Sequence, residues 1–374
     1  MNLRTLLLSL STFALLAACS AEPEQAGPPP ASRASLAAIK GDPGTAREEL
    51  ARAIDRLFET EATGQTRALV VMHGGERVAE RYAEGFDEDT RFMGWSLSKC
   101  VTGVMIGLLV SDGRLRLDES APVPAWSRTG DPRGEITLRQ LLQMRSGLRH
   151  DEAGEPLYGA DTPRMLFLEG RDDTAAYAEA QPLENEPGAV FNYSSATSVI
   201  LSDIAARSLT ERAEPATRRG VIDSFLRTRL FEPIGMDSAT AEYDAAGTML
   251  GGSMIHATAR DWARLGEFLR HKGSVRGAQV IPRRWIEFML TPSPREPAYG
   301  AHVWLNRPRE NGVPVLFPDR APETLFACIG HRGQYVIGSP EQKLTVVRLG
   351  HSSAEQQDAV RQRLGELVAL YPAD

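Results

Sequence analysis

The chain lacks the residue patterns that define several common protein classes. It has only three cysteines in 374 residues, too few for the disulfide framework of a small secreted domain. Its seven histidines are scattered and do not join cysteine at metal-ligand spacing, which argues against a zinc hydrolase. The net charge of −7 comes from mixed signs, so nucleic acid and anionic lipid are not indicated as partners. We predict no metal and no cofactor.

The apolar stretch near the N-terminus is too short and too quickly interrupted to span a membrane. It runs from Leu6 to Ala18 behind a basic residue, which is the shape of a secretory signal. It ends in the letters LAAC, which resemble a bacterial lipoprotein signal, in which the cysteine becomes the new N-terminus and carries the lipid. We therefore predict a signal peptide over residues 1–18 and membrane attachment through lipid on Cys19. An ordinary signal cut after Ala18 is the alternative.

Ser20 follows the predicted lipidation site, where an aspartate is absent. In bacteria with two membranes this resembles sorting to the outer membrane. We therefore expect an exported, periplasmic-side lipoprotein attached to the outer membrane.

The segment 19–44 is predicted to be the lipidated residue and a flexible tether. It is rich in Pro, Ala, Ser and Gly and has no apolar periodicity. An N-terminal arm packed on the domain is the alternative. Residues 45–374 then form one large domain, because no second linker or internal repeat interrupts them. Within it, Cys100 and Cys328 either pair or remain buried free thiols.

Apolar periodicity predicts strands near both ends of this domain and helices between them. Thr45 with Glu48, and Thr137 with Gln140, have the spacing of capping boxes that open helices. Short strands are predicted in a hairpin around residues 74–75 and in the late stretches AYGAHVWLN, TLFACIG, QYVIGSP and KLTVVRLG. The pattern favours an α+β fold, in which an antiparallel sheet from both chain ends is flanked by helices and carries an inserted, mostly helical lobe.

Ser96 and Lys99 stand three residues apart in GWSLSKC, where a strongly apolar helix over residues 94–110 begins. Residues at this spacing share one helix face, so the two side chains can meet. A lysine kept neutral by burial can take the proton of a serine and make it a nucleophile. Alone the S-x-x-K spacing is weak, because a capped helix start with a surface charge has the same letters.

The surrounding motifs strengthen the chemical interpretation. FNYSSATSVIL follows about a hundred residues later, and CIGHRGQYVIG lies near the end of the chain. With the S-x-x-K motif, these stretches resemble the serine β-lactamase and penicillin-binding-protein superfamily. The stretches ITLRQLLQMRSGL, FEPIGMDSA and GGSMIHATARDWARLGEFL resemble its class C β-lactamase-like branch, which includes esterases, D-amino-acid peptidases and 6-aminohexanoate-dimer hydrolases. The resemblance covers roughly residues 45–370.

The resemblance implies roles for individual residues. Ser96 matches the acylated nucleophile, Lys99 the lysine that hydrogen-bonds it, and Tyr193 the tyrosine of the second motif, which relays protons. The backbone N–H groups of Ser96 and Gln334 are then expected to form the oxyanion hole. Which of Lys99 and Tyr193 is the base stays open.

The third motif is expected to contact the substrate. His331 is predicted to bind substrate, and Gly333 to let substrate approach the strand edge. Further residues are candidates for lining the cleft, although a packing or surface position is the favoured explanation for each: Tyr177, Asp173, Trp304, Tyr299 and Arg332.

Two departures from the family pattern bear on the substrate. The second motif reads Tyr193-Ser194-Ser195 without the asparagine of β-lactamases, and the third reads His331-Arg332-Gly333 instead of Lys-Thr-Gly. Loss of polar groups built for one substrate sharply reduces its recognition. We therefore predict a secreted serine hydrolase that cleaves a small-molecule or peptide-like ester or amide. The alternatives are a D-amino-acid peptidase or weak β-lactamase, or a slowly acylating sensor or binding module.

Overall fold

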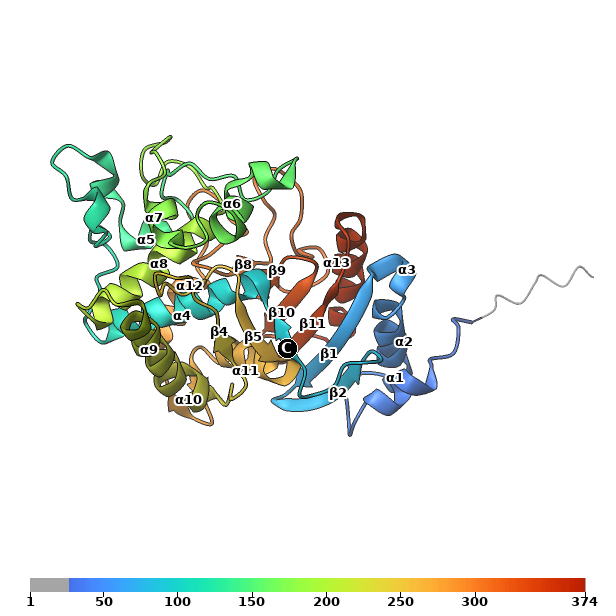
Figure 1. The fold of residues 1–374 in the computed structure, drawn as a ribbon. Coiled ribbons are helices and arrows are strands. Elements are labelled where there is room, and N and C mark those ends of the chain that lie inside the picture. The colour runs from blue at the N-terminus through green and yellow to red at the C-terminus, as the bar shows by residue number, and fades with distance from the viewer. Residues whose placement is uncertain (1–26, 374) are drawn as a thin grey trace, which may run out of the picture. The chain divides into compact units, whose positions relative to one another are not determined.

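The computed structural model describes residues 27–373, so the predicted signal peptide and Cys19 lie outside the described part. Its main element is a six-stranded antiparallel sheet in the order β2-β1-β11-β10-β9-β8 (Figure 1). The early strands are β1 (Gln65–His73) and β2 (Glu76–Tyr82), and the late ones are β8 (Trp304–Leu305), β9 (Phe326–Gly330), β10 (Gln334–Ser339) and β11 (Leu344–His351). The predicted α+β fold, with a sheet built from both ends of the chain, is confirmed.

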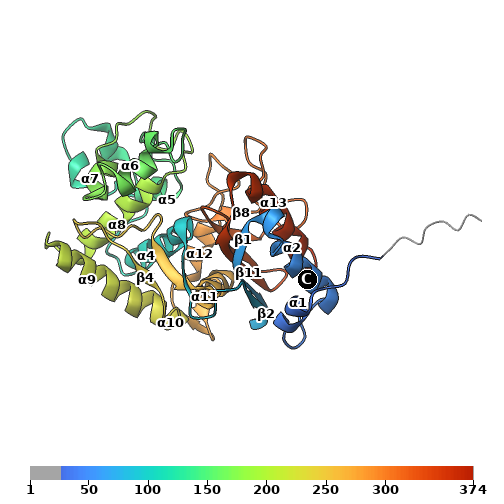
Figure 2. The same ribbon diagram turned by 45° about the vertical axis from the view of Figure 1, so that its right-hand side comes forward.

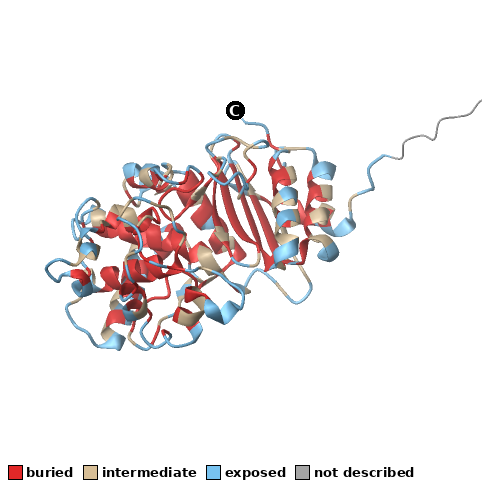
Figure 3. Cartoon of the chain, turned by 90° about the horizontal axis from the view of Figure 1, so that it is seen from above, coloured by how far each residue is buried: buried red, intermediate tan, exposed pale blue. Residues whose placement is uncertain are grey.

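Alternation along the strands gives the sheet two buried faces. Leu69 and Val71 of β1 pack with α2 (Arg47–Leu57) and α13 (Ala354–Val368), whereas Ala68 and Val70 face the opposite core. That second core holds α11 (Ala259–Arg270) and the helical region. In Figure 3 the strands are buried along most of their length, and the helices beside them expose only their outer sides. The sheet is therefore a rigid middle layer.

Most helices lie between the early and the late strands in sequence, as predicted (Figure 2). The central one is α4 (Ser98–Ser111), in which 12 of 14 residues are buried, and it packs against α8 (Ser195–Leu209). The other helices of this region are α5 (Leu138–Leu142), α6 (Asp161–Phe167), α7 (Thr174–Glu179), α9 (Pro215–Leu226), α10 (Glu232–Ile234) and α12 (Arg283–Met289).

Two small sheets accompany the six-stranded sheet in the described part of the chain. One contains β3 (Arg91–Met93), β5 (Ile255–Thr258) and β4 (Thr240–Ala241), and the other is the hairpin of β6 (Ser274–Val275) and β7 (Ala278–Gln279). In the described part of the chain, none of the helices combines the length and the apolar content needed to cross a bilayer.

The structure corrects two expectations at the start of the domain. Residues 31–44 are not a free tether, because α1 (Arg33–Ala38) packs beside α2 and Ile39 bridges to Ala79 of β2. The capping box at Thr45 is also wrong, since its hydroxyl donates to Leu370 O at 3.0 Å and α2 has no side-chain cap. Tertiary packing overrides the local signal at both places. The second capping box, at Thr137 and Gln140, is confirmed.

Candidate active site

Ser96 lies in a short 3₁₀ turn (Trp95–Leu97) that leads into α4. Trp95 has a φ of +50°, a left-handed conformation that costs energy for a bulky residue. The turn is held to β5, because Gly94 N donates to Ile255 O at 2.8 Å and Ile255 N donates to Ser98 Oγ at 3.0 Å. Strand β5 therefore fixes the strained turn that presents Ser96 at the N-terminal end of the buried helix.

Lys99 is almost fully buried and directed at the serine. Its Nζ donates to Ser96 Oγ at 3.0 Å, to Ser195 Oγ at 2.8 Å and to Gly252 O at 2.9 Å. Burial lowers the pKa of Lys99 to about 8, even though the carboxylate of Glu152 acts to raise it. The predicted meeting of Ser96 and Lys99 on one helix face is therefore confirmed, and the lysine can lose its proton near neutral pH.

Tyr193 lies beside the same ammonium group. Lys99 Nζ is 4.8 Å from the centre of the Tyr193 ring, and the ring packs against Trp304 and Tyr299 with centroid distances of 5.5 and 5.8 Å. Burial raises the pKa of Tyr193, the charge of Glu152 raises it further, and a hydrogen bond with Ser96 lowers it only in part. The resting tyrosine is thus a neutral phenol that can donate a proton but is a poor base.

Glu152 is a member of the site that the sequence analysis missed. Its carboxylate accepts from Ser195 N at 2.7 Å and from Ser195 Oγ at 2.6 Å, and it lies 2.9 Å from His150 Nε2. Thr162 Oγ1 on α6 donates to the same carboxylate at 3.0 Å. Burial acts to raise the pKa of Glu152, but Lys99, His150 and Ser195 together lower it to about 2. The sequence held only an indirect signal for Glu152: a buried lysine such as Lys99 requires an acidic neighbour, but the sequence does not say which one.

The third motif forms the turn between β9 and β10. The His331 ring lies 5.2 Å from the ring of Trp95, the residue before Ser96. Gly333 has a φ of +82°, and a Cβ there would meet Arg348 Nη1 at 2.7 Å. Gly333 therefore makes room for a buried arginine, a structural reason for glycine at this position that the sequence analysis did not include.

Gln334, whose backbone N–H was expected in the oxyanion hole, opens strand β10. Gln334 belongs to β10, which lies between β9 and β11, and it pairs with Gly330 across the hairpin. Its side chain is used as well, because it bonds Gly350 N and O at 2.9 and 2.7 Å. Both β9 and β10 contact the Ser96 turn, and β8 pairs with only the first two residues of β9. The free edge of β9 is thus the available source of backbone N–H groups.

Four of the five cleft candidates divide into two groups. Tyr299 and Trp304 line the site, with centroids 4.8 Å apart. Tyr177 and Asp173 are structural: the Tyr177 hydroxyl donates to Asp161 Oδ1 at 2.8 Å, and Asp173 caps α7 by accepting from Ala176 N at 2.9 Å. Packing therefore explains the second pair.

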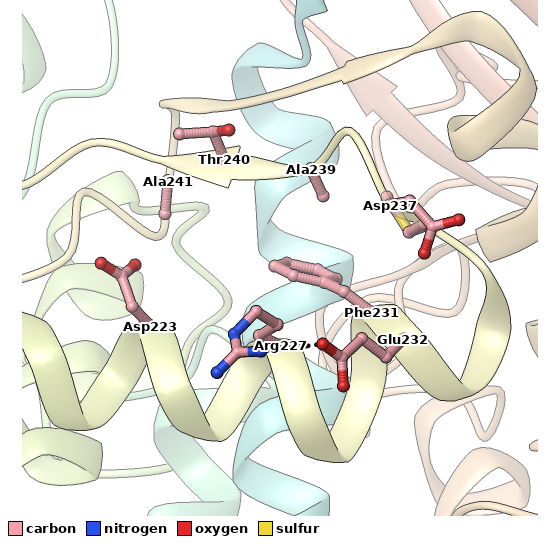
Figure 4. Close-up of a pocket in the computed structure, with 9 residues that line it drawn as sticks. Asp223, Arg227, Phe231, Glu232, Asp237, Ala239, Thr240 and Ala241 are labelled. Atoms are coloured by element: carbon pink, nitrogen blue, oxygen red, sulfur yellow. Dashed lines mark hydrogen bonds and ion pairs between the residues drawn. The ribbon is translucent and has the colours of Figure 1, made fainter.

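A separate surface pocket lies between the helices α9 and α10 and strand β4 (Figure 4). It has a volume of about 440 Å³ and includes the carboxylates of Asp223, Glu232 and Asp237, but none of the predicted site residues lines it. Glu232 is paired with Arg227 at 2.9 Å.

Over residues 27–373, no group of His, Cys, Asp or Glu is arranged to hold a metal ion.

A disulfide joins the two sides of the candidate site. Cys100, next to Lys99, is bonded to Cys328 of β9, and their Cα atoms are 6.2 Å apart. The question left open by the sequence is thereby resolved in favour of pairing. The bond fastens the helix with the nucleophile motif to the strand whose free edge faces it.

Comparisons with known proteins agree with this arrangement. A family model described as beta-lactamase matches residues 54–370. A 6-aminohexanoate-dimer hydrolase from Paenarthrobacter ureafaciens is 26% identical over 282 residues, which are 73% of this chain and 67% of that protein.

Two solved structures have a similar fold. A protein from Bacillus anthracis described as a candidate 6-aminohexanoate-dimer hydrolase has a TM-score of 0.65 and 24% identity, over 83% of this chain and 80% of that one. A family VIII carboxylesterase has a TM-score of 0.58 and 15% identity, over 87% of this chain and 99% of the esterase.

Proposed function

This chain belongs to the beta-lactamase family of serine hydrolases, and from that premise we propose that it cleaves a small ester or amide through an acyl-enzyme on Ser96. The observation that carries the proposal is the 3.0 Å hydrogen bond between Lys99 Nζ and Ser96 Oγ, with the lysine buried. A buried lysine directed at a serine costs stability, and a surface-capping role would not require it.

The proposed first step uses neutral Lys99 as the base. With a pKa of about 8, about a tenth of Lys99 is neutral at pH 7. That fraction takes the Ser96 proton while Oγ attacks the carbonyl carbon and a tetrahedral oxyanion forms. The Ser96 N–H and the free edge of β9 stabilise this oxyanion. Tyr193, as a phenol, donates its proton to the leaving group, and Lys99 returns a proton to Tyr193. Water then repeats the sequence and releases the acid.

The substrate class follows from what surrounds Ser96. The aromatic wall of Tyr193, Tyr299 and Trp304 suits an apolar or extended acyl group. The asparagine and lysine of the β-lactamase motifs are missing, so an ester or a linear amide is favoured over a β-lactam. The 6-aminohexanoate-dimer hydrolase relative points the same way. A D-amino-acid peptidase, a weak β-lactamase and a slowly acylating sensor are the alternatives.

We also propose that the protein is exported and anchored by lipid on Cys19, in the outer membrane. The signal-like N-terminus supports this proposal. The Cys100–Cys328 disulfide supports it independently, because such bonds persist in oxidising compartments and are rare in the cytosol.

The decisive experiment compares hydrolysis of a short p-nitrophenyl ester by the purified protein and by Ser96→Ala. We expect kcat/KM to fall at least about 1,000-fold in the variant. Equal rates in the two proteins would overturn the proposal. Nitrocefin, a D-alanyl dipeptide and 6-aminohexanoate dimer, assayed in parallel, rank the substrate alternatives. A mass adduct on Ser96 that persists for hours would identify the sensor.

A further inference from the structure

Glu152 reaches the catalytic lysine through a single hydroxyl group. Ser195 Oγ donates to Glu152 Oε1 at 2.6 Å and accepts from Lys99 Nζ at 2.8 Å. Because the one proton of the hydroxyl is used on Glu152, the lone pairs of the oxygen are turned toward Lys99. The carboxylate thereby fixes the direction of the hydrogen bond that holds the lysine.

We propose that Glu152 is a positioning residue of this site, which holds Lys99 on Ser96 through Ser195 and supplies the negative charge that compensates the lysine cation formed during acylation. The proposal rests on the proposed acyl-enzyme mechanism. In that step Ser96 loses a proton and Lys99 gains it. The resulting ammonium cation is separated from the Glu152 carboxylate only by the hydroxyl group of Ser195.

The loop that carries Glu152 is built to keep the carboxylate in place. Thr162 Oγ1 on α6 donates to it at 3.0 Å, and His150 Nε2 on the same loop lies 2.9 Å from it. Ser195 N, at the start of α8, donates to its Oε2 at 2.7 Å. Four partners on one carboxylate are more than a solvated surface glutamate needs.

This arrangement takes the place of a missing group. The second motif has Ser195 where the β-lactamase pattern has asparagine, and a serine hydroxyl alone is shorter and carries no fixed dipole toward the lysine. The pair of Ser195 and Glu152 provides an oriented acceptor and a full charge instead. The asparagine of the family's second motif is absent, and Glu152 from another loop provides a polar group in its place.

Other titratable groups around the pair do not provide this charge. Burial raises the pKa values of Tyr193 and Tyr299 and lowers those of His302 and His331, so these four side chains stay neutral between pH 7 and 9. His150 on the same loop bonds the carboxylate itself. Since Glu152 has a pKa of about 2, it is ionised throughout this range, although its side chain is 29% exposed and water screens part of its field.

The first test measures the protonation of Lys99 without any assay of activity. The chain has only four lysines, Lys40, Lys99, Lys272 and Lys343, so protein labelled with ¹³Cε-lysine gives few signals, and Lys99→Arg identifies the one that matters. Glu152→Gln removes a charge that favours the ammonium form. We expect the pKa of Lys99 to fall by about 1 unit in this variant. Glu152→Asp and Asp151→Asn, an exposed carboxylate on the same loop, should leave it within about 0.3 units.

The second test follows the pH dependence of kcat/KM for the p-nitrophenyl ester. In the wild type, kcat/KM should rise with pH as Lys99 loses its proton, and this rise is the acid limb of the profile. In Glu152→Gln we expect the acid limb to move to lower pH by about 1 unit, with kcat about 10-fold lower at the plateau. Ser195→Ala keeps the carboxylate, so its limb should stay in place while kcat falls. A residue with a purely structural role would change the rate or the melting temperature and leave the limb where it was.

Several results would overturn the proposal. They are an unchanged Lys99 pKa in Glu152→Gln, or a Glu152→Asp variant whose Lys99 pKa falls as far as that of Glu152→Gln. If Glu152→Gln does not fold, Glu152→Asp and Ser195→Ala still give the comparison of pH limbs, and a displaced limb in Glu152→Asp would count against the proposal. If the wild type shows no Ser96-dependent hydrolysis, the proposed function fails, while the lysine titration still decides the role of Glu152.

Discussion

The nucleophile turn at residues 94–99 and the hairpin turn at residues 331–334 lie beside each other but are held in different ways. Ser96 and Lys99 meet because three residues of helix separate them, and Lys99 Nζ reaches Ser96 Oγ at 3.0 Å. The hairpin turn is held by distant residues instead: Arg348 Nη1 donates to Gly333 O at 2.8 Å, and Gln334 bonds Gly350. Local spacing therefore predicts the first turn, and only the tertiary structure explains the second.

The largest effect should come from the locally determined turn. Replacing Lys99 by Met removes the proposed base, and we expect kcat/KM for the p-nitrophenyl ester to fall at least about 1,000-fold. Lys272→Met is the control, since its amino group is paired with Glu287 on the surface at 3.2 Å, and it should change kcat/KM less than twofold. A Lys99→Met enzyme with near wild-type rates would remove Lys99 from the chemistry.

The next effect should come from the distant support of the hairpin turn. Arg348 is fully buried and bonds Thr66 Oγ1, Gly333 O, Thr63 O and Ser352 Oγ. Among residues 27–373 it forms no ion pair with a carboxylate. Arg348→Met leaves these acceptors unpaired, so we expect a loss of about 3–5 kcal/mol in the free energy of unfolding and a higher KM. Denaturant titration measures the first and steady-state kinetics the second.

The control for this change is Arg276→Met, which alters an exposed arginine in another hairpin turn. It should stay within about 0.5 kcal/mol of the wild type. If both variants lost the same stability, the buried network around Arg348 would not be what holds the turn.

The disulfide joins α4 and β9, the elements next to the two turns, and removing it should let the turns move relative to each other. For Cys100→Ala with Cys328→Ala we expect a loss of about 2–5 kcal/mol in the free energy of unfolding, together with a lower kcat because the edge of β9 is no longer fastened to α4. A reductant should lower the melting temperature of the wild type and leave the double variant unchanged. Equal sensitivity of both proteins would show that the reductant acts elsewhere.

The smallest effect separates backbone strain from the contact with Arg348. Gly333 and Gly130 have φ values of +82° and +84°, but a Cβ at Gly130 meets no atom within 4 Å. Gly130→Ala should cost about 1 kcal/mol for the backbone alone, and Gly333→Ala about 1 kcal/mol more, because its Cβ meets Arg348 Nη1. Thermal unfolding of the two variants gives the difference. Equal losses would mean that Arg348 adapts without cost.

What the sequence predicts well is set by nearby residues. The hairpin at residues 74–75, the capping box at Thr137 and the pairing of Ser96 with Lys99 each depend on a span of a few residues, and all three are present. The strand patterns at both ends of the chain also predicted one antiparallel sheet built from both ends, although not the order of its strands.

What the sequence predicts poorly depends on long-range packing. Glu152 is one of 49 acidic residues, and only the folded chain brings it to Ser195, 43 positions away. Gln334 was assigned from a motif match, but its strand is covered on both sides. Thr45 has a capping pattern, yet its hydroxyl bonds Leu370 at the other end of the chain.

The sheet order has a consequence for a chain that leaves the ribosome N-terminus first. Strand β1, near the start of the domain, is hydrogen-bonded to β11, near its end. Cys100 likewise forms its disulfide with a cysteine 228 residues later in the chain. The S-x-x-K motif is therefore complete long before the strand edge that serves it exists. A chain cut short before β9 has the proposed nucleophile but lacks the other half of the proposed site, so we expect incomplete copies of this protein to be inactive.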